Sequence, residues 1–551
     1  MHAGLLLLLL ASPCAALAPA PAVDLGNYSL PITTSSGAAQ RLFDAGLMQE
    51  FSFNQAESRR AFAAAAAADP ARCAMCQWGV AYAWGPFLNH PVMSAEQAQR
   101  AYAASRAAAA MVAAAASPAD YSALERGLIG AIVARHPSAD AGANQTVGYL
   151  AYVDALEALV ARLAPATGAA ADAAGALLAE ALMLLESNDY YAGESMGDTN
   201  TTARQLRPFS ARASAVLRPL LPRAQPMALH LYIHLTEPAV PGSGGPGAGM
   251  GEGAADALRA QRLSGSGHLE HMPGHLYLRV GRYADAVAAN DGAAAADSRY
   301  TTLGMSPYGP CHNLYFGVYA ACMAGMRDAA YAGAARMRAV YATNLTRRDA
   351  PGLDQGWEAA LTSYVRFGDW EKLLADERAV PAGAPPTPYA SLLRHYARGL
   401  ASNARGAAAA AAAELASLRA LRPAVSRLDG SSFDRLADVA NLTLSAALAL
   451  RGGGDATGAL AMLRSAAAAQ NSWHYDVSAA CCVLRAAAAP PGRSPTRSPA
   501  TDTDADTATD TTFFARLCLR WLANAGTAQL AHAHSAVPRQ GAARRRRRGR
   551  G

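Results

Sequence analysis

GHLEHMPGHLYLRVGRYADA, residues 267–286, carries two superimposed patterns. The first consists of small and aromatic residues at helical spacing: Gly274, Tyr277, Gly281, Tyr283 and Ala286. The second consists of three histidines within eight residues: His268, His271 and His275. The first pattern predicts a pair of packed helices, because small residues on one helix allow another to lie close against it. Helix packing does not call for the histidines, which makes them candidates for a functional site.

The same pattern of small and aromatic residues recurs along the chain. LFDAGLMQEFSFNQAESRRAFAAAAAADP, residues 42–70, places Gly46 in one helix, Phe62 in the next and Pro70 as a stop. WEAALTSYVRFGDWEKLL, residues 357–374, repeats the pattern. The offsets resemble the tetratricopeptide repeat (TPR), a helix-turn-helix unit of about 34 residues. Since such a unit buries its apolar face only against its neighbours, we predict an all-α protein, a TPR-like α-solenoid of stacked helix-turn-helix units.

Changes in composition predict the organisation of the chain. Apolar spacing predicts helices, ahead of His230, at about 119 to 135, 148 to 164, 170 to 186 and 203 to 221. The predicted segments are a signal peptide at 1–18, an extended N-terminal segment at 19–39, N-terminal helical repeats at 40–237, a Gly-rich loop at 238–262, C-terminal TPR-like repeats at 263–489, a disordered low-complexity linker at 490–512, and a short helix with a basic tail at 513–551.

The N-terminus indicates the secretory pathway or an extracellular location. Six consecutive leucines precede a small-residue ALA that ends at Ala18, as in a cleaved signal peptide. This apolar run is shorter than the roughly 20 residues that span a bilayer, and we expect no transmembrane segment beyond it. Five N-x-S/T sequons agree with a secreted glycoprotein: Asn27, Asn144, Asn200, Asn344 and Asn441.

Charge argues against nucleic acid as a partner. The chain has 48 Lys plus Arg and 42 Asp plus Glu, but six of the arginines lie in the last eight residues, from Arg544. The remaining chain is neutral, whereas a phosphate-binding surface needs an excess of cations on the folded part. No nucleotide-binding loop is present either, so we expect no nucleotide cofactor.

The segment HLYIHLTE, residues 230–237, is the first candidate for chemistry. His230 and His234 are four residues apart and Glu237 follows three later, so a helix places all three side chains on one face. Two imidazoles and a carboxylate from one rigid element suit a transition metal such as zinc, copper or iron. Leu231 follows His230 in place of the glutamate of HExxH, which argues against a standard metallopeptidase.

The second candidate is the opening segment, where His271 and His275 are again four residues apart. Pro273 favours a helix that begins near Met272 and leaves His268 and His271 at its entry. The 46 residues from His230 to His275 hold five of the thirteen histidines, so the predicted metal ligands are taken from both segments: His230, His234, Glu237, His268, His271 and His275. The alternative is structural: imidazoles that cap helices or bond to tyrosines and backbone carbonyls.

A third segment, CAMCQWGVAYAWGPFLNHP at 73–91, contains a CxxC motif. The helical surroundings and the absence of a second CxxC favour a buried pair or a local disulfide over a redox or zinc site. Asn89 and His90 follow a Gly-Pro break and are possible groove-lining residues, as are His312 and Asn313 in CHNLYF.

These motifs resemble, in the same order, those of a group of large secreted or periplasmic tetratricopeptide proteins with a His-rich HMPxH motif. The likeness covers roughly residues 40 to 470, and no reaction is established for the group. It implies an α-solenoid. It also marks matching positions at His230, His234, Glu237, His268, His271, His275, His312 and Asn313. The chain departs from the group at Gln55, where relatives tend to have histidine.

Two functions follow as hypotheses. The first is a secreted repeat protein with a His/Glu transition-metal site, either a metal-dependent hydrolase or an oxidase, acting on an unknown small molecule or peptide in the solenoid groove. The second is a non-catalytic TPR scaffold that binds a protein or peptide. The scaffold predicts histidines that lie apart, with imidazole nitrogens of His230, His234 and His271 more than about 8 Å from one another, since zinc–nitrogen bonds are near 2 Å.

Overall fold

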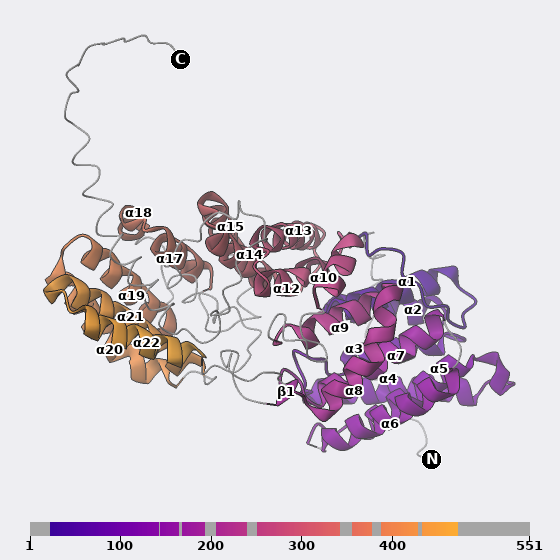
Figure 1. Cartoon of the computed structure of the whole chain (residues 1–551). Coiled ribbons are helices and arrows are strands. Elements are labelled where there is room, and N and C mark those ends of the chain that lie inside the picture. The colour runs from indigo at the N-terminus through magenta and orange to yellow at the C-terminus, as the bar shows by residue number, and fades with distance from the viewer. Residues whose placement is uncertain are drawn as a thin grey trace, which may run out of the picture. The chain divides into compact units, whose positions relative to one another are not determined.

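The computed structural model describes residues 23–142, 144–164, 168–192, 205–239, 251–341, 355–376, 387–427 and 432–471. These residues are helical almost throughout, and consecutive helices pack against each other, which confirms the all-α solenoid (Figure 1). The two short strands named among them, β1 (Tyr191–Ala192) and β2 (Gln205–Leu206), pair antiparallel. The chain divides into two compact units, one up to Ala360 and one at Leu361–Gln470.

The first unit begins with pairs of antiparallel helices and holds all the predicted metal ligands. Its α-helices are α1 (Gly37–Phe51), α2 (Gln55–Ala68), α3 (Ala74–Trp84), α4 (Ala95–Ala113), α5 (Ala123–Arg135), α6 (Gln145–Leu163), α7 (Ala169–Leu184), α8 (Pro208–Leu217), α9 (Pro226–Thr236), α10 (Gly251–Ala260), α11 (Gly267–His271), α12 (Pro273–Arg279), α13 (Tyr283–Thr302), α14 (Pro310–Ala324) and α15 (Arg327–Tyr341). Two 3-10 helices, η1 (Pro118–Asp120) and η2 (Arg218–Arg223), lie between them.

The second unit repeats the arrangement of consecutive packed helices. Helix α19 packs on α20, and α21 packs on both. Helix α22 adds a small core of its own, in which Ala459 and Leu463 pack against Ala446 of α21. The helices are α18 (Trp370–Ala375), α19 (Pro388–Ala404), α20 (Ala408–Val425), α21 (Ser432–Gly453) and α22 (Ala456–Asn471), while α17 (Gln355–Phe367) contains the boundary between the units.

Polar caps in the sequence set where several of these helices start. The side chain of Ser36 accepts from Ala39 N at the start of α1, and that of Asn54 accepts from Glu57 N at the start of α2. Ser266 caps α11 through Leu269 N. Each cap satisfies a backbone N–H that has no partner inside its helix, which stabilises the helix by about 1 kcal/mol.

The first repeat packs through one phenylalanine between two glycines. Phe62 of α2 is fully buried, and a Cβ atom on Gly46 of α1 would lie 2.7 Å from its ring. A Cβ atom on Gly79 of α3 would lie 2.3 Å from the same ring. Both distances are shorter than any van der Waals contact, so glycine at both positions lets α1 and α3 close on Phe62 from two sides. The predicted pairing of Gly46 with Phe62 is confirmed.

We therefore expect Gly79→Ala to lower the free energy of unfolding by about 1 to 3 kcal/mol, as for overpacked cores. Urea unfolding followed by far-UV circular dichroism measures the change. The matched control is Gly130→Ala in α5, where nothing lies within 4 Å of the added Cβ, so helix propensity should stabilise the protein by up to about 1 kcal/mol. Equal effects at the two sites would contradict this packing.

The expected helices ahead of His230 are confirmed as α5, α6, α7 and α8 with η2, although most boundaries differ by a few residues. The helix expected from near Met272 is confirmed as α12, which has Met272 as its N-cap and Pro273 in its first turn. The short helix α11, which precedes it and holds His268 and His271, was not expected.

One expectation was wrong. The Gly-rich loop at 238–262 contains helix α10, because GEGAADALRA has enough alanine and leucine to form an amphipathic helix once Ala255 and Leu258 are buried.

Several predictions fall on residues outside the described ranges. They concern the signal peptide at 1–18, the sequons at Asn200 and Asn344, the linker at 490–512 and the basic tail at 513–551. Among the described helices, none is both long enough and apolar enough to cross a membrane.

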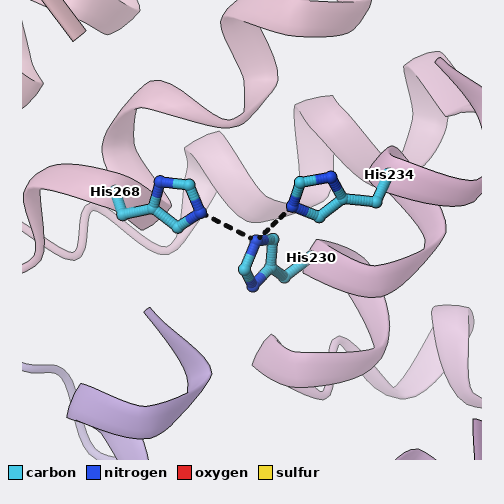
Figure 2. A group of neighbouring side chains, drawn as sticks. All are labelled: His230, His234 and His268. Carbon is cyan, nitrogen blue, oxygen red and sulfur yellow. Dashed lines mark hydrogen bonds between the residues drawn. The ribbon is translucent and has the colours of Figure 1, made fainter. Parts of the chain in front are cut away.

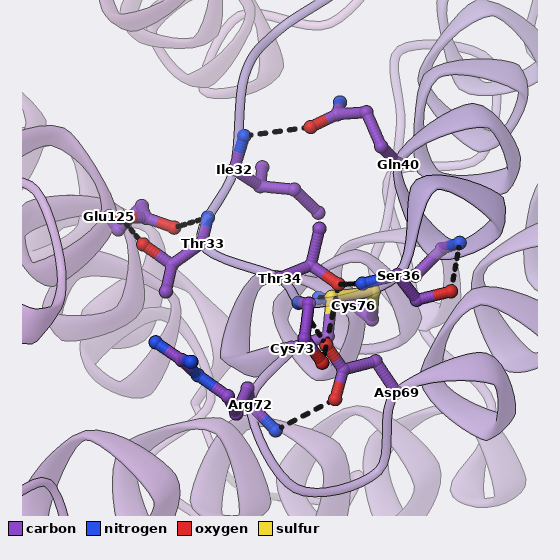
Figure 3. The surroundings of a disulfide bond; sticks show 12 residues. Ile32, Thr33, Thr34, Ser36, Gln40, Asp69, Arg72, Cys73, Cys76 and Glu125 are labelled. Atoms are coloured by element: carbon purple, nitrogen blue, oxygen red, sulfur yellow. Dashed lines mark hydrogen bonds between the residues drawn. A yellow bond between two sulfur atoms is a disulfide. The ribbon is translucent and has the colours of Figure 1, made fainter.

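The CxxC motif forms a disulfide between Cys73 and Cys76 at the start of α3 (Figure 3). Both cysteines are buried. The adjacent turn is held by Asp69, whose carboxylate accepts hydrogen bonds from Thr34 Oγ1 at 2.6 Å and from Arg72 N at 3.2 Å. The Thr34 bond is the largest cause that lowers the pKa of Asp69. The sequence favoured either a buried pair of cysteines or a local disulfide, and the structure contains the disulfide.

Candidate metal centre

Two helices, α9 and α11, bring the first three histidines together. His230 and His234 lie one turn apart on α9, and His268 comes from α11. Their Nε2 atoms converge: those of His234 and His268 each lie 3.1 Å from His230 Nε2 (Figure 2). We call these three residues the first triad. One ring nitrogen from each lies within 4.8 Å of the others, a spacing that can hold a metal ion.

A second triad consists of His271, His275 and His312. His271 ends α11, His275 lies in α12 and His312 lies in the first turn of α14. The Nε2 atoms of His271 and His275 are 2.7 Å apart, and one ring nitrogen from each of the three again lies within 4.8 Å of the others. Among the described residues, the groups with metal-binding spacing consist of histidine only.

Hydrogen bonds determine where His230 and His271 carry their protons. His230 Nδ1 lies 2.6 Å from the carbonyl oxygen of Phe51, which can only accept, so the proton is on Nδ1. His271 Nδ1 lies 2.6 Å from Asn290 Oδ1. The Asn290 amide is oriented by its own Nδ2, which donates to the Ala286 carbonyl at 2.8 Å. In both neutral imidazoles, Nε2 therefore presents a lone pair to its triad.

His275 lies beside a carboxylate. Its Nδ1 is 2.8 Å from Glu237 Oε1, without the geometry of a hydrogen bond. The Nε2 atoms of His271 and His275 are 2.7 Å apart. A metal ion between the two rings would take an electron pair from each Nε2 atom. Outer-shell carboxylates are typical of metal-bound histidines.

The other two imidazoles of the first triad have no such anchor. Neither His234 Nδ1 nor His268 Nδ1 has a hydrogen-bond partner, although both atoms are buried. His230 Nε2 has one lone pair, so it can accept a hydrogen bond from only one of the two. A metal ion is the arrangement in which all three Nε2 atoms act as donors of electron pairs at once.

Five of the six triad imidazoles are buried, and His312 is partly exposed. Burial favours the neutral, metal-binding form of His230, His234, His268, His271 and His312. Desolvation lowers the pKa of His230 and that of His312 to about 3. Desolvation also lowers the pKa values of His234, His268 and His271 well below 6.5, and the neighbouring imidazoles add to this effect.

One phenylalanine packs against each triad. Phe53 lies with its ring centroid 4.5 to 5.5 Å from those of His230, His234 and His268. Phe316 lies 4.4 to 5.1 Å from those of the second triad. Phe53 has φ 58°, a left-handed conformation that is strained for a bulky residue and is seen most often at functional sites. The apolar rings limit the access of water to both triads.

The repeat packing itself supplies one part of the site. Asn290 of α13 lies between two glycines, much as Phe62 does: a Cβ on Gly274 of α12 would lie 2.9 Å from its Nδ2, and a Cβ on Gly317 of α14 would lie 3.1 Å from its Cβ. This position is buried and holds His271 Nδ1. Asn290 is a polar residue within an alanine-rich helix. It was not identified from the sequence as part of the site, although this unusual position indicates a function.

The structure differs from the predicted single site in two respects. Glu237 is not a member of either triad. It caps the C-terminal end of α9, where its carboxylate lies against Nδ1 of His275. His312, expected only to line a groove, completes the second triad. The scaffold hypothesis expected His230, His234 and His271 to be separated. The ring nitrogens of His230 and His234 are 3.1 Å apart, whereas His271 belongs to the second triad.

The remaining candidates lie around the triads or away from them. Asn313 is buried and donates through Nδ2 to Asp297 Oδ2 at 2.9 Å, next to His312 in the chain. Asn89 donates to the hydroxyl of Tyr308, whose ring packs edge-on against His268 at 5.0 Å. His90 is exposed and is not in either triad.

A scan against protein-family models found no match to this chain. A search of curated proteins found none either. The case for a function therefore depends on the geometry of the two triads.

Proposed function

We propose that the protein binds two transition-metal ions, one in each histidine triad, and that it is a copper-dependent oxidase. The observation that carries this proposal is the convergence of three ring nitrogens in each triad, with His271 Nε2 and His275 Nε2 of the second triad 2.7 Å apart. Ligands on one metal, with bonds of about 2.0 to 2.1 Å, lie about 3.3 to 3.6 Å from each other. The nitrogens need to move apart by less than 1 Å to reach this spacing.

The neutral ligand set favours copper over zinc and iron. All six members of the two triads are imidazoles, which bind zinc, copper and iron alike, but copper(II) has the highest affinity for such sites. Two divalent ions would bring four positive charges into a buried site with one carboxylate, Glu237, in contact with a ligand. Two copper(I) ions bring only two. Because uncompensated buried charge is costly, copper(I) suits this environment better.

The surroundings favour oxidation over hydrolysis. A metal-dependent hydrolase needs a bound water and a nearby base. Here Phe53 and Phe316 pack against the triads, and the Glu237 carboxylate is engaged with His275. The converging nitrogens also favour a metal site over the non-catalytic scaffold, which gives no reason for two buried triads.

Metal analysis of the purified protein tests the proposal. After reconstitution with copper(I) in the absence of oxygen and removal of excess metal, we expect two copper ions per chain. The matched control is His395→Ala: this histidine lies in the second unit, where its Nδ1 contacts Glu414 Oε2 at 2.6 Å, and its loss should leave the copper content unchanged. A wild-type chain without bound copper contradicts the proposal.

Glu237→Gln is expected to weaken copper binding in the second triad by about 10- to 100-fold, as for other outer-shell partners, with the first triad unaffected. The amide lacks the charge that makes the His275 imidazole a stronger ligand. Competition with a chelator of known copper affinity measures the two constants. Glu414→Gln changes the same kind of contact at His395 and serves as the control. Equal affinity in the wild type and Glu237→Gln would show that Glu237 does not tune a ligand.

Two further parts of the proposal concern the scaffold and its location. We propose a TPR-like repeat, supported by Phe62 between Gly46 and Gly79 at the first helix crossings. We also propose passage through the secretory pathway, supported by the Cys73–Cys76 disulfide, since disulfides persist in oxidising compartments. The substrate that is oxidised is proposed to be a small molecule or peptide in the solenoid groove.

A further inference from the structure

The two triads are in direct contact with each other. The ring centroids of His234 and His275 are 6.3 Å apart, and those of His268 and His271 are 5.9 Å apart. The second pair is nearly parallel, with 30° between the ring planes, and both residues belong to α11. One five-residue helix therefore contributes a ligand to each triad, so that two bound ions become neighbours in a single centre.

Where the two triads meet, the residues leave room for a ligand from outside the protein to bind both metal ions. Two-metal hydrolytic centres hold their ions with carboxylates and water, but the metal-binding groups among the described residues contain no carboxylate. Phe53 packs on the rings of the first triad and Phe316 on those of the second. Two ions with three neutral ligands each would keep open coordination positions in apolar surroundings.

We propose that the two triads form one dinuclear copper centre that binds dioxygen between its ions. This inference rests on the proposed function, because it requires both ions to be present. Dioxygen is small and apolar, and it suits a site whose lining is aromatic. His312 of the second triad is partly exposed, as is Tyr308, whose ring packs against His268 of the first triad, so dioxygen has a short path inward.

The reaction balances in electrons and in charge. Each copper(I) gives up one electron, so both ions become copper(II) and dioxygen becomes peroxide with its O–O bond retained. Two copper(I) ions carry two positive charges, and two copper(II) ions with one peroxide dianion carry the same net charge. The buried centre therefore binds dioxygen without any change in total charge, and no proton has to enter. Buried sites disfavour changes in net charge, so the neutral ligand set fits this step.

Oxygen uptake and electron paramagnetic resonance together test the inference. Protein loaded with copper(I) is analysed for copper first and then exposed to dissolved oxygen. We expect uptake of one dioxygen per two copper ions and a copper(II) X-ray absorption edge, with little paramagnetic signal because bridged copper(II) ions couple. Two bound copper ions that take up no oxygen, or that give the full signal of isolated copper(II), overturn this inference alone. A chain that binds no copper overturns the proposed function as well.

His312→Ala provides the single-ion comparison. His312 is the least buried of the six ligands, so its truncation disturbs the core least. This variant should keep about one copper ion, show the paramagnetic signal of isolated copper(II) after oxidation, and lose the stoichiometric oxygen uptake. His395→Ala should behave as the wild type. Uptake of one dioxygen per chain by His312→Ala, again without signal, would show that the second triad is not part of the oxygen site.

Discussion

Replacing His230 by alanine is expected to lower the copper content from two ions per chain to about one, and His271→Ala should do the same through the other triad. Each change removes one of three ligands, which costs more affinity than the about 10- to 100-fold loss for an outer-shell partner. His230 Nε2 contacts both other nitrogens of its triad, so its loss leaves two imidazoles without a common centre. The double variant should retain no tightly bound copper.

The measurement is copper per chain after gel filtration, with circular dichroism to confirm that helix content is kept. Since both histidines are buried, alanine leaves a cavity, so His230→Gln and His271→Gln are included as larger replacements. The copper content of the four single variants and the double variant is compared as a set. If either single variant still holds two ions at the wild-type affinity, the assignment of one ion to each triad is wrong.

Acidification of the metal-free protein from pH 7 to pH 5 is expected to lower its free energy of unfolding by about 2 kcal/mol through His136 alone. This residue is 1% exposed at the end of α5, and its ring nitrogens have no hydrogen-bond partner. Burial is the largest cause that lowers its pKa from 6.5 to about 3, followed by the charges of Arg135 and Arg106. The unfolded chain therefore binds a proton that the folded chain excludes.

The direction of this pH effect follows from the difference between the pKa values of His136 in the folded and unfolded chains. The folded-state pKa is the lower one, so the stabilising effect is complete above pH 6.5 and is lost progressively as the pH falls towards 3. Burial also lowers the pKa values of His230, His234, His268, His271 and His312, so these imidazoles act in the same direction. Urea unfolding at a series of pH values measures the slope, and His136→Leu should make it shallower between pH 7 and pH 5. A slope that is identical in this variant would mean that His136 is protonated in the folded protein.

The sequence was sufficient to predict most of the helices and five of the six triad histidines, because both depend on local spacing. Small residues at helical offsets predicted the packed pairs around Gly46 and Phe62, and the i, i+4 spacing of His230 with His234 predicted neighbouring imidazoles. These features are fixed by the geometry of one helix. They do not depend on how distant helices are packed.

The division into two triads depended on tertiary packing and was not predicted. α11 contributes His268 to one triad and His271 to the other, and this follows from the positions of α9 and α14 around it. The role of Glu237 also depends on where α12 places His275. Phe53 could not be identified as part of the site, because its left-handed backbone carries no residue signal such as glycine or asparagine.

The position of Asn290 between Gly274 and Gly317 has a consequence for how such a centre can arise. The corresponding crossing in the first repeat is filled by Phe62, which only packs. Two close helix crossings thus hold different side chains: an aromatic ring that packs, and an amide that orients a histidine. We infer that a side chain at one crossing can be exchanged for one that supports a binding site while the other crossings continue to stabilise the array.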